Sequence, residues 1–421
     1  MELQTKALHA GYEKDSQGTM AVPIYMTTAY EFRDVEHAAN LFALKELGNI
    51  YTRLNNPTTD VFEKRFAALE GGEAALATAS GMSAIFFAIA NAAEAGDNIV
   101  CAQQLYGGSL TLNTHTLKRF GIESRFFDVQ NPASIEALID DKTKVIFFES
   151  LTNPSIDVAD IEAITAIANK HGILTVVDNT VATPVLCRPF EFGADITVHS
   201  ASKYTTGQGL AIGGILVERK GLLEKLKGNP RYAHFNEPDA SYHGLVYVDV
   251  PLPIFTLRAR LSLLRDLGAT SSPFNSWLFI QGLEHLSLRM KEHSNNALKL
   301  AEFLESHPKV KKVNYPGLKS NANYKNAQKY FDNGASSGLL SFEVDSLEEA
   351  TKIVDATELY SLVVNIGDSK SIITHPASTT HQQLSEEELM ACGVPSGLIR
   401  ISCGLESSAD LIADIKQALD K

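Results

Sequence analysis

The sequence predicts an α/β protein built on a mostly parallel sheet, followed by a smaller α+β domain at the C-terminus. Short, apolar, β-branched runs recur along the chain up to about residue 217, and helical or loop segments separate most of them. A long helical pattern near residue 277 then replaces this alternation. With 421 residues, the chain is long enough to bury a large core and to form more than one domain.

Residues 1–57 predict an extended arm rather than a part of the sheet. Their hydrophobic periodicity is weak, and Pro23 and Pro57 interrupt it. An arm of this kind must lie on some other surface, and we expect that surface to belong to a neighbouring subunit.

The large domain is expected over residues 58–267. It begins with a helical pattern that stops at a Gly-Gly pair, and a short strand over 74–77 and a helix over 83–95 follow. The later apolar runs that predict strands cover residues 98–101, 145–148, 174–177, 196–198 and 212–217.

The C-terminal domain is expected over residues 268–421. A helical pattern runs from Trp277 to Leu304, and strand-like segments follow at 310–314 and 338–344, with helical segments between and after them. This mixture differs from the regular alternation of the large domain, and it therefore predicts a separate α+β unit.

Composition excludes several classes of function. The formal net charge of −13 argues against nucleic acid or an anionic membrane as the main partner. The four cysteines lack the spacing of a zinc cluster or a disulfide framework, and we expect no metal. The N-terminus lacks the apolar core of a signal peptide, and the longest apolar run is too short for a bilayer. These features predict a cytoplasmic protein.

Polar residues follow three of the predicted strands, where ligands collect in an open parallel sheet. The strand near residue 148 ends in Glu149, the next ends in Asp178, and a third is followed by Lys203. A buried aspartate can hold a pyridinium nitrogen protonated, and a lysine with a lowered pKa can form a Schiff base. Taken singly, such an aspartate is usually a cap and such a lysine is usually solvated. Their combination favours cofactor chemistry.

A phosphate site is predicted between the strand at 74–77 and the helix that follows it. Free N–H groups and the helix dipole favour an anion there, although a serine and a glycine before a helix often form a simple cap. Two further segments can contribute: the arm offers directed donors, and Tyr106 can stack on a flat ring. The residues assigned to the phosphate are Ser80, Gly81, Met82, Ser200, Ser202, Tyr51 and Arg53.

These motifs together resemble the Cys/Met-metabolism family of pyridoxal-phosphate enzymes, in order and over nearly the whole chain. The resemblance implies PLP fold type I, which is aspartate-aminotransferase-like with helices on both faces of the sheet, and pyridoxal 5'-phosphate as the cofactor. The motifs that carry it are Tyr51-x-Arg53-x-x-Asn56-Pro57-Thr58, Ser80-Gly81-Met82, Tyr106-Gly107-Gly108, Glu149-Ser150-x-x-Asn153-Pro154, Asp178-Asn179-Thr180 and Ser200-Ala201-Ser202-Lys203-Tyr204.

Within this family, residues 236–244, 264–269 and 362–368 are most similar to O-acetylhomoserine sulfhydrylases. The similarity implies replacement of the acetyl ester of O-acetyl-L-homoserine by sulfide, giving L-homocysteine and acetate for methionine biosynthesis. The alternatives are a methionine γ-lyase, a cystathionine γ-synthase or lyase, and a binding protein without catalysis. The sulfur donor stays open between sulfide, a thiol and a sulfur-carrier protein, as does the choice of acetyl or succinyl ester.

The resemblance also implies roles for single residues. Lys203 would carry the Schiff base, Asp178 would pair with the ring nitrogen, and Tyr106 would stack on the ring and act as an acid or base. Tyr51 and Arg53 would reach the phosphate from a neighbouring subunit, within a homotetramer built as a dimer of dimers. The substrate would be held by Arg400 on its α-carboxylate, helped by Asn153, Ser361 and Tyr51.

Overall fold

The computed structural model describes the whole chain except residues 381, 383–385 and 392. Its larger sheet has seven strands in the order β1-β7-β6-β5-β4-β2-β3, and every neighbouring pair is parallel except the two that involve β7. The prediction of a mostly parallel sheet is confirmed. In chain order the strands are β1 (Ala74–Thr78), β2 (Asn98–Ala102), β3 (Glu123–Phe127), β4 (Thr143–Glu149), β5 (Leu174–Asp178), β6 (Ile196–Ser200) and β7 (Gly214–Glu218).

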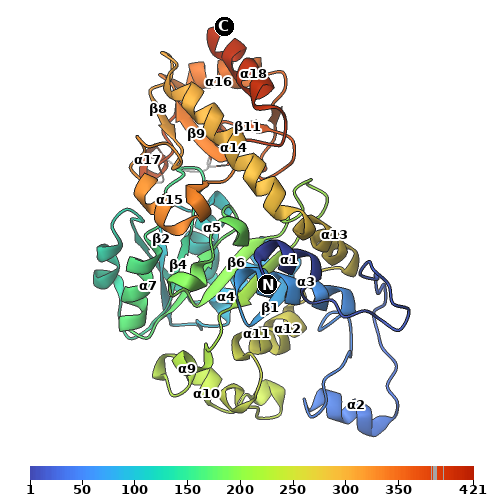
Figure 1. Ribbon diagram of the computed structural model, residues 1–421. Helices are drawn as coiled ribbons and strands as arrows, with labels where there is room; N and C mark the ends of the chain where they lie inside the picture. Colours follow the sequence, from blue (N-terminus) through green and yellow to red (C-terminus); the bar gives the residue numbers. More distant parts are fainter. Residues whose placement is uncertain (381, 383–385, 392) are drawn as a thin grey trace.

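Helices surround this sheet (Figure 1). Among them, α3 packs on β1 and β7, α4 packs on β6 and β7, and α7 packs on β5. The helix predicted over 83–95 begins earlier and ends earlier, because Ser80 caps α4 and the helix stops at Ala90. The helices of this part are α3 (Pro57–Glu70), α4 (Gly81–Ala90), α5 (Gly107–Thr111), α6 (Leu117–Arg119), α7 (Ile161–Lys170), α8 (Thr183–Leu186), α9 (Leu223–Leu226), α10 (Ala233–Asn236), α11 (Ile254–Arg258), α12 (Arg265–Leu267) and α13 (Pro273–Glu284).

A second sheet of five strands, in the order β10-β11-β12-β9-β8, lies in the C-terminal part. Most of its buried apolar residues share a hydrophobic cluster with α14, α16 and α18 that is separate from the cluster around the large sheet, to which Leu339 and Leu398 belong. Domain limits at residues 57 and 267 remain a prediction. The elements are α14 (Leu286–Glu305), β8 (Lys312–Asn314), α15 (Tyr324–Tyr330), β9 (Leu339–Glu343), α16 (Leu347–Ala356), β10 (Ser361–Leu362), β11 (Ile372–Thr374), α17 (Glu386–Ala391), β12 (Leu398–Ser402) and α18 (Ser408–Asp420).

The long helix predicted from Trp277 to Leu304 is two helices. The chain leaves helical geometry at His285, where φ is −119° and ψ is 16°, and α13 and α14 meet there. The first half of α14 contributes Leu286 and Met290 to the large cluster, and its second half contributes Leu300 and Leu304 to the C-terminal cluster. Helix α14 therefore connects the two hydrophobic cores.

The N-terminal arm is not wholly extended, and that part of the prediction is wrong. Helix α1 (Leu3–His9) packs on α3 and α13 through the buried side chain of Ala7. Helix α2 (Val35–Phe42), capped by Asp34, lies on a segment that projects away from the sheet at the lower right of Figure 1. The helices were missed because each is short, with seven residues in α1 and eight in α2. In the described ranges, no helix has the length and apolarity needed to cross a membrane.

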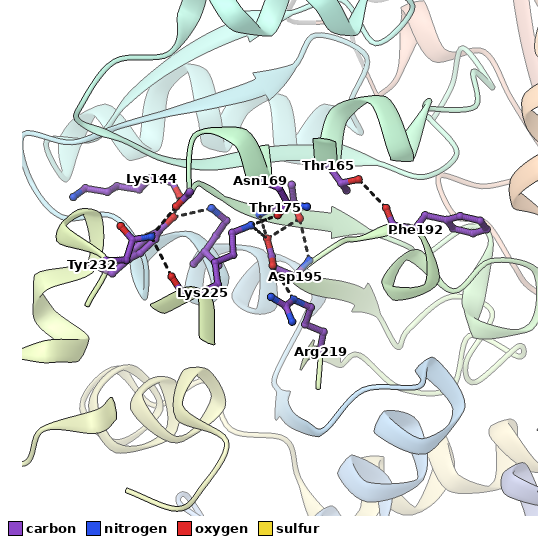
Figure 2. A network of polar contacts seen from close by, with 12 residues as sticks. Lys144, Thr165, Asn169, Thr175, Phe192, Asp195, Arg219, Lys225 and Tyr232 are labelled. Atoms are coloured by element: carbon purple, nitrogen blue, oxygen red, sulfur yellow. Dashed lines mark hydrogen bonds and ion pairs between the residues drawn. The ribbon is translucent and has the colours of Figure 1, made fainter. Parts of the chain in front are cut away.

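A network of polar contacts joins the amino ends of β5 and β6 (Figure 2). Asp195, the residue before β6, is 1 % exposed and accepts hydrogen bonds from the N–H and the hydroxyl of Thr175 at 3.0 and 3.1 Å. Arg219 Nε donates to it at 2.9 Å and Lys225 Nζ donates at 2.6 Å. Both carboxylate oxygens of Asp195 are therefore paired, and the contacts tie the two strands to the end of β7 and to α9.

Candidate active site

A cavity of about 430 Å³ opens at the carboxyl ends of β4, β5 and β6. Residues of the large sheet form most of its wall, and the C-terminal part adds Arg400 from β12 and the loop residues Val364, Asn365 and Ile366. Ten residues that the sequence assigns to the site line this cavity together: Ser80, Gly81, Met82, Tyr106, Asn153, Asp178, Ser200, Ser202, Lys203 and Arg400.

The turn between β1 and α4 forms an anion cradle on this wall. Ser80 Oγ caps the helix by accepting the Ser83 N–H at 3.1 Å, and α4 begins at Gly81. A Cβ atom on Gly81 would lie 2.7 Å from Ser200 Cβ, and one on Gly214 would lie 2.1 Å from the Ser80 carbonyl oxygen. Glycine is thus required for the backbones to approach this closely. The N-terminus of α4 presents N–H groups and a positive dipole, which suit a phosphate.

Asp178 ends β5 inside the cavity. Burial raises the pKa of its carboxyl group, while hydrogen bonds from the hydroxyl and N–H of Thr180 and the nearby His199 lower it in part. No lysine or arginine of the described chain forms an ion pair with Asp178. A buried carboxyl group in this state favours a ligand that brings a positive charge or a proton to it.

Lys203 follows β6 by three residues and is largely buried. Burial, and secondly the charge of Arg400, lower the pKa of its amine to about 8. A lysine in this range has a substantial neutral fraction near pH 7 to 8, as a nucleophile or base requires. Its Nζ donates a hydrogen bond to Asn365 Oδ1.

Asn365 was missed by the reasoning from sequence. It lies in the loop between β10 and β11, which has no strand pattern and no charged motif that would indicate a functional residue. The sequence includes it only as part of the stretch 362–368, which carries the family resemblance. Its carbonyl oxygen also accepts a hydrogen bond from Arg400 Nη2 at 3.0 Å, so that one residue contacts both cationic groups of the cavity.

Arg400 is 3 % exposed, and burial lowers the pKa of its guanidinium group to about 10. Its Nη1 donates to Asn153 Oδ1 at 3.0 Å. Its Nε is buried and has no hydrogen-bond partner within the part of the chain that the structure describes. A guanidinium group fixed in this way, with a free donor, is suited to a ligand carboxylate.

Tyr106 lies at the mouth of the cavity, 39 % exposed, at the residue before α5. Its N–H donates to Glu149 Oε1 at 2.6 Å. The other oxygen of Glu149 accepts the Asn153 N–H at 3.1 Å. The loops that carry Tyr106 and Asn153 are therefore joined through one carboxyl group.

Three residues assigned from the sequence lie outside the cavity of this chain. Arg53 stacks over the ring of Tyr51, with 5.4 Å between its Cζ and the ring centroid, and neither residue lines the cavity. Their contribution to a neighbouring subunit remains a prediction. Ser361 is exposed in β10, donates its N–H to the Ser371 carbonyl and does not line the cavity, so its contact with the substrate remains a prediction. The chain turns toward the cavity only at Val364.

The cavity combines four binding properties: an anion cradle, a partly buried carboxyl group without a cationic partner, an amine of lowered pKa, and a guanidinium group with a free donor. A ligand with a phosphate, a basic ring nitrogen, a carbonyl carbon and a carboxylate would satisfy all four. Nowhere in the described residues do three or more His, Cys, Asp or Glu side chains gather as metal ligands.

The chain is similar over nearly its whole length to known proteins of one family. Residues 4–420 match the family described as Cys/Met metabolism PLP-dependent enzyme. The chain is 48% identical to an O-acetyl-L-homoserine sulfhydrylase of Leptospira meyeri, over 99% of this chain and 96% of that protein. It is 45% identical to a homocysteine synthase of Schizosaccharomyces pombe, over 99% and 98%.

A crystal structure from Campylobacter jejuni is similar over the full length of both chains, with 54% identity and a TM-score of 0.99. It is described as a putative O-acetylhomoserine (thiol)-lyase with N'-pyridoxyl-lysine-5'-monophosphate. A second structure, of metB from Corynebacterium glutamicum, is 32% identical with a TM-score of 0.85, over 100% of this chain and 98% of that one.

Proposed function

Because the chain belongs to the Cys/Met metabolism family of PLP-dependent enzymes, we propose that it replaces the acetyl ester of O-acetyl-L-homoserine with sulfide. The products are L-homocysteine and acetate, and the step serves methionine biosynthesis. One observation carries the proposal: Lys203, Asp178 and Arg400 line the same cavity as the cradle at Ser80. The names of the relatives at 43 to 48% identity supply the choice of substrate.

The cavity fits pyridoxal phosphate by the four binding properties described above. The phosphate would lie at the N-terminus of α4, held by Ser80, Gly81, Met82, Ser200 and Ser202, and the ring would lie against Tyr106. When bound, the cofactor supplies an electron sink conjugated to the substrate's amino group.

Side chains of the protein carry out the binding and proton-transfer steps. Arg400 binds and orients the α-carboxylate of the substrate, and Asp178 holds a proton at the ring nitrogen. Lys203 removes the Cα proton, because its lowered pKa of about 8 leaves the amine able to accept one near neutral pH. A second proton is removed from Cβ before the C–O bond at Cγ breaks and acetate leaves with the bonding pair. Hydrosulfide forms the new C–S bond, and both protons return to carbon.

Tyr106 would serve as the acid or base for one of these protons. Its partly exposed position in the cavity lining, which Arg400 also forms, supports this role. Asn153 would support the carboxylate site through its hydrogen bond to Arg400.

The decisive assay supplies the purified, pyridoxal-phosphate-loaded protein with O-acetyl-L-homoserine and sulfide. We expect homocysteine and acetate in equal amounts. Formation of 2-oxobutyrate and ammonia without homocysteine would replace the proposal with a γ-lyase. Parallel reactions with O-succinyl-L-homoserine, with cysteine, and with a thiocarboxylated carrier protein in place of sulfide would identify the preferred ester and sulfur donor.

The active site would be completed by a second copy of the chain. Tyr51 and Arg53 lie in the arm, outside their own cavity, and the proposed position for their side chains is the phosphate and substrate of a neighbour within a dimer of dimers. Mixing inactive Lys203→Ala and Arg53→Ala proteins under subunit exchange should restore part of the activity, because each mixed dimer then contains one intact site. A cytoplasmic location is also proposed, and the free thiols of Cys101, Cys187 and Cys403 support it.

A further inference from the structure

Glu149 occupies an unusual place in the cavity wall. It ends β4 directly beside Asp178 on β5, and it is 4 % exposed. Its two oxygens accept hydrogen bonds from the backbone N–H groups of Tyr106 at 2.6 Å and Asn153 at 3.1 Å. The proposed reaction assigns it no role.

The two hydrogen bonds join parts of the site that are otherwise far apart in the sequence. One donor belongs to the loop after β2, which carries Tyr106, and the other belongs to the loop after β4, which carries Asn153. Asn153 in turn accepts from Arg400 Nη1 at 3.0 Å. A carboxylate is the side chain suited to this position, because both of its oxygens accept, whereas an amide has one oxygen and one NH₂.

Burying the carboxyl group of Glu149 at this position costs free energy. Burial and then the neighbouring Asp178 raise the pKa of Glu149 well above its usual value, and the two backbone N–H groups lower it only in part. No lysine or arginine among the described residues forms an ion pair with it. A buried acid beside a second, partly buried acid gains little for folding, so its two hydrogen bonds point to a role in the geometry of the site.

We propose that Glu149 is a positioning residue for recognition of the substrate's α-carboxylate, holding Asn153 so that Arg400 faces the ligand and fixing the loop that carries Tyr106. This inference rests on the proposed function, because it assumes that Arg400 binds an amino-acid carboxylate.

The test measures how tightly two amines bind to the pyridoxal-phosphate-loaded protein, from the change in absorbance of the cofactor. L-2-Aminobutyrate carries an α-carboxylate and no leaving group, and propylamine is the same amine without the carboxylate. In Glu149→Gln the side chain keeps its length but can accept only one of the two N–H groups. We expect L-2-aminobutyrate to bind about tenfold more weakly, the effect of losing about one hydrogen bond, and propylamine to bind as in the unaltered protein.

A second variant separates position from charge. Glu149→Asp keeps the carboxylate but is shorter by one CH₂ and cannot reach both loops. We expect the same selective loss for L-2-aminobutyrate. Full recovery in Glu149→Asp would show that charge matters and position does not, which would overturn the proposal.

Glu218→Gln is the matched control. Glu218 is also a buried glutamate of the large sheet, its pKa is raised to about 8 by burial, and it accepts the Thr256 N–H at 2.7 Å. It lies at the end of β7 that pairs with the amino end of β6, away from the cavity. We expect this variant to change stability and to leave the ratio of the two affinities unchanged.

The remaining outcomes are also decisive. Equal weakening of both probes, no weakening of either, or failure of both Glu149 variants to fold would assign Glu149 to the fold and overturn the proposal. If the unaltered protein does not distinguish L-2-aminobutyrate from propylamine, the proposed function itself fails, because Arg400 then binds no carboxylate.

Discussion

The same three kinds of charged residue gather near the two ends of strand β5, paired at one end and unpaired at the other. At the amino end, Asp195 is paired with Arg219 and Lys225, and both of its oxygens are occupied. At the carboxyl end, Asp178, Lys203 and Arg400 line one cavity without pairing with each other.

The pKa shifts express this difference. At the carboxyl end, burial raises the pKa of Asp178 and lowers those of Lys203 and Arg400 to about 8 and about 10. Every one of these shifts disfavours the charged form, and a ligand of complementary charge would reverse them. Charge paired within the protein stabilises the fold, whereas buried charge left without a protein partner is available for binding and chemistry. Matched substitutions at the two ends test this distinction.

The largest effect is expected from the lysines. Lys203→Ala should lower kcat by at least about 10³-fold, because one group supplies both covalent attachment and proton transfer, and its unfolding midpoint should change little. Lys225→Ala should leave kcat near its original value and destabilise the protein, because Asp195 loses a buried partner. Steady-state kinetics and urea denaturation of both variants check this pair. A fall in kcat for Lys225→Ala comparable to that of Lys203→Ala would remove the contrast.

The aspartates should differ in the same direction. Asp178→Asn should lower kcat by about 10²-fold to 10³-fold, because an amide cannot hold the ring nitrogen protonated, as electrostatic groups of this kind typically contribute. Asp195→Asn should instead lower the free energy of unfolding by about 3 to 5 kcal/mol, the cost of removing one partner from a buried ion pair. Denaturation curves that coincide for the two variants would contradict the assignment of stability to the amino end.

The arginines give a smaller contrast. Arg400→Lys should raise KM for the amino acid about tenfold to 100-fold, because a point charge replaces a directed, charge-assisted pair of donors. Arg219→Lys should cost less than about 1 kcal/mol of stability, because the partly exposed pair with Asp195 can re-form with an ammonium group. The split between KM and kcat measures the first effect, and denaturation measures the second.

The smallest effect is a shift in pH dependence. In the protein freed of cofactor, the rate at which Lys203 captures pyridoxal phosphate should rise with pH and level off above about 8, because only the neutral amine reacts. Arg400→Gln removes the cationic neighbour that lowers this pKa, so its midpoint should move to higher pH. A stopped-flow absorbance profile compares the two proteins, and identical midpoints would exclude the influence of Arg400.

The free energy of unfolding of the cofactor-free protein should also depend on the protonation of Lys203. The pKa of Lys203 is lower in the folded protein than in the unfolded chain, so folding disfavours its protonation. Its burial therefore destabilises the cofactor-free protein most below pH 8, and this penalty disappears as the pH rises from about 8 to about 10.4, the ordinary lysine pKa.

The sequence predicts the large sheet well because its buried strands are apolar runs that end in polar residues. The edge strand β3 was not predicted, because Glu123, Ser124 and Arg125 lack the apolar pattern of a buried strand. Most of the site follows from the strand ends, where Asp178 and Lys203 could be recognised. Arg400 was identified through the family resemblance alone.

Other parts of the site depend on tertiary contacts that no local pattern records. Asn365 reaches Lys203 and Arg400 only because the C-terminal sheet lies over the cavity. For the same reason, the sequence does not indicate that Ser361 lies outside the lining of the cavity, and its role in substrate binding stays a prediction. Pairing across domains is decided by packing, which a single sequence does not display.

Helix α14 has a mechanical consequence. Its two halves belong to different hydrophobic cores, and it begins at the break at His285. Lys203 follows β6 of the large sheet, while Arg400 lies on β12 of the other sheet. The hydrogen bond between Lys203 and Asn365 spans the same junction, so a movement of the C-terminal sheet relative to the large sheet would change both this bond and the packing along α14.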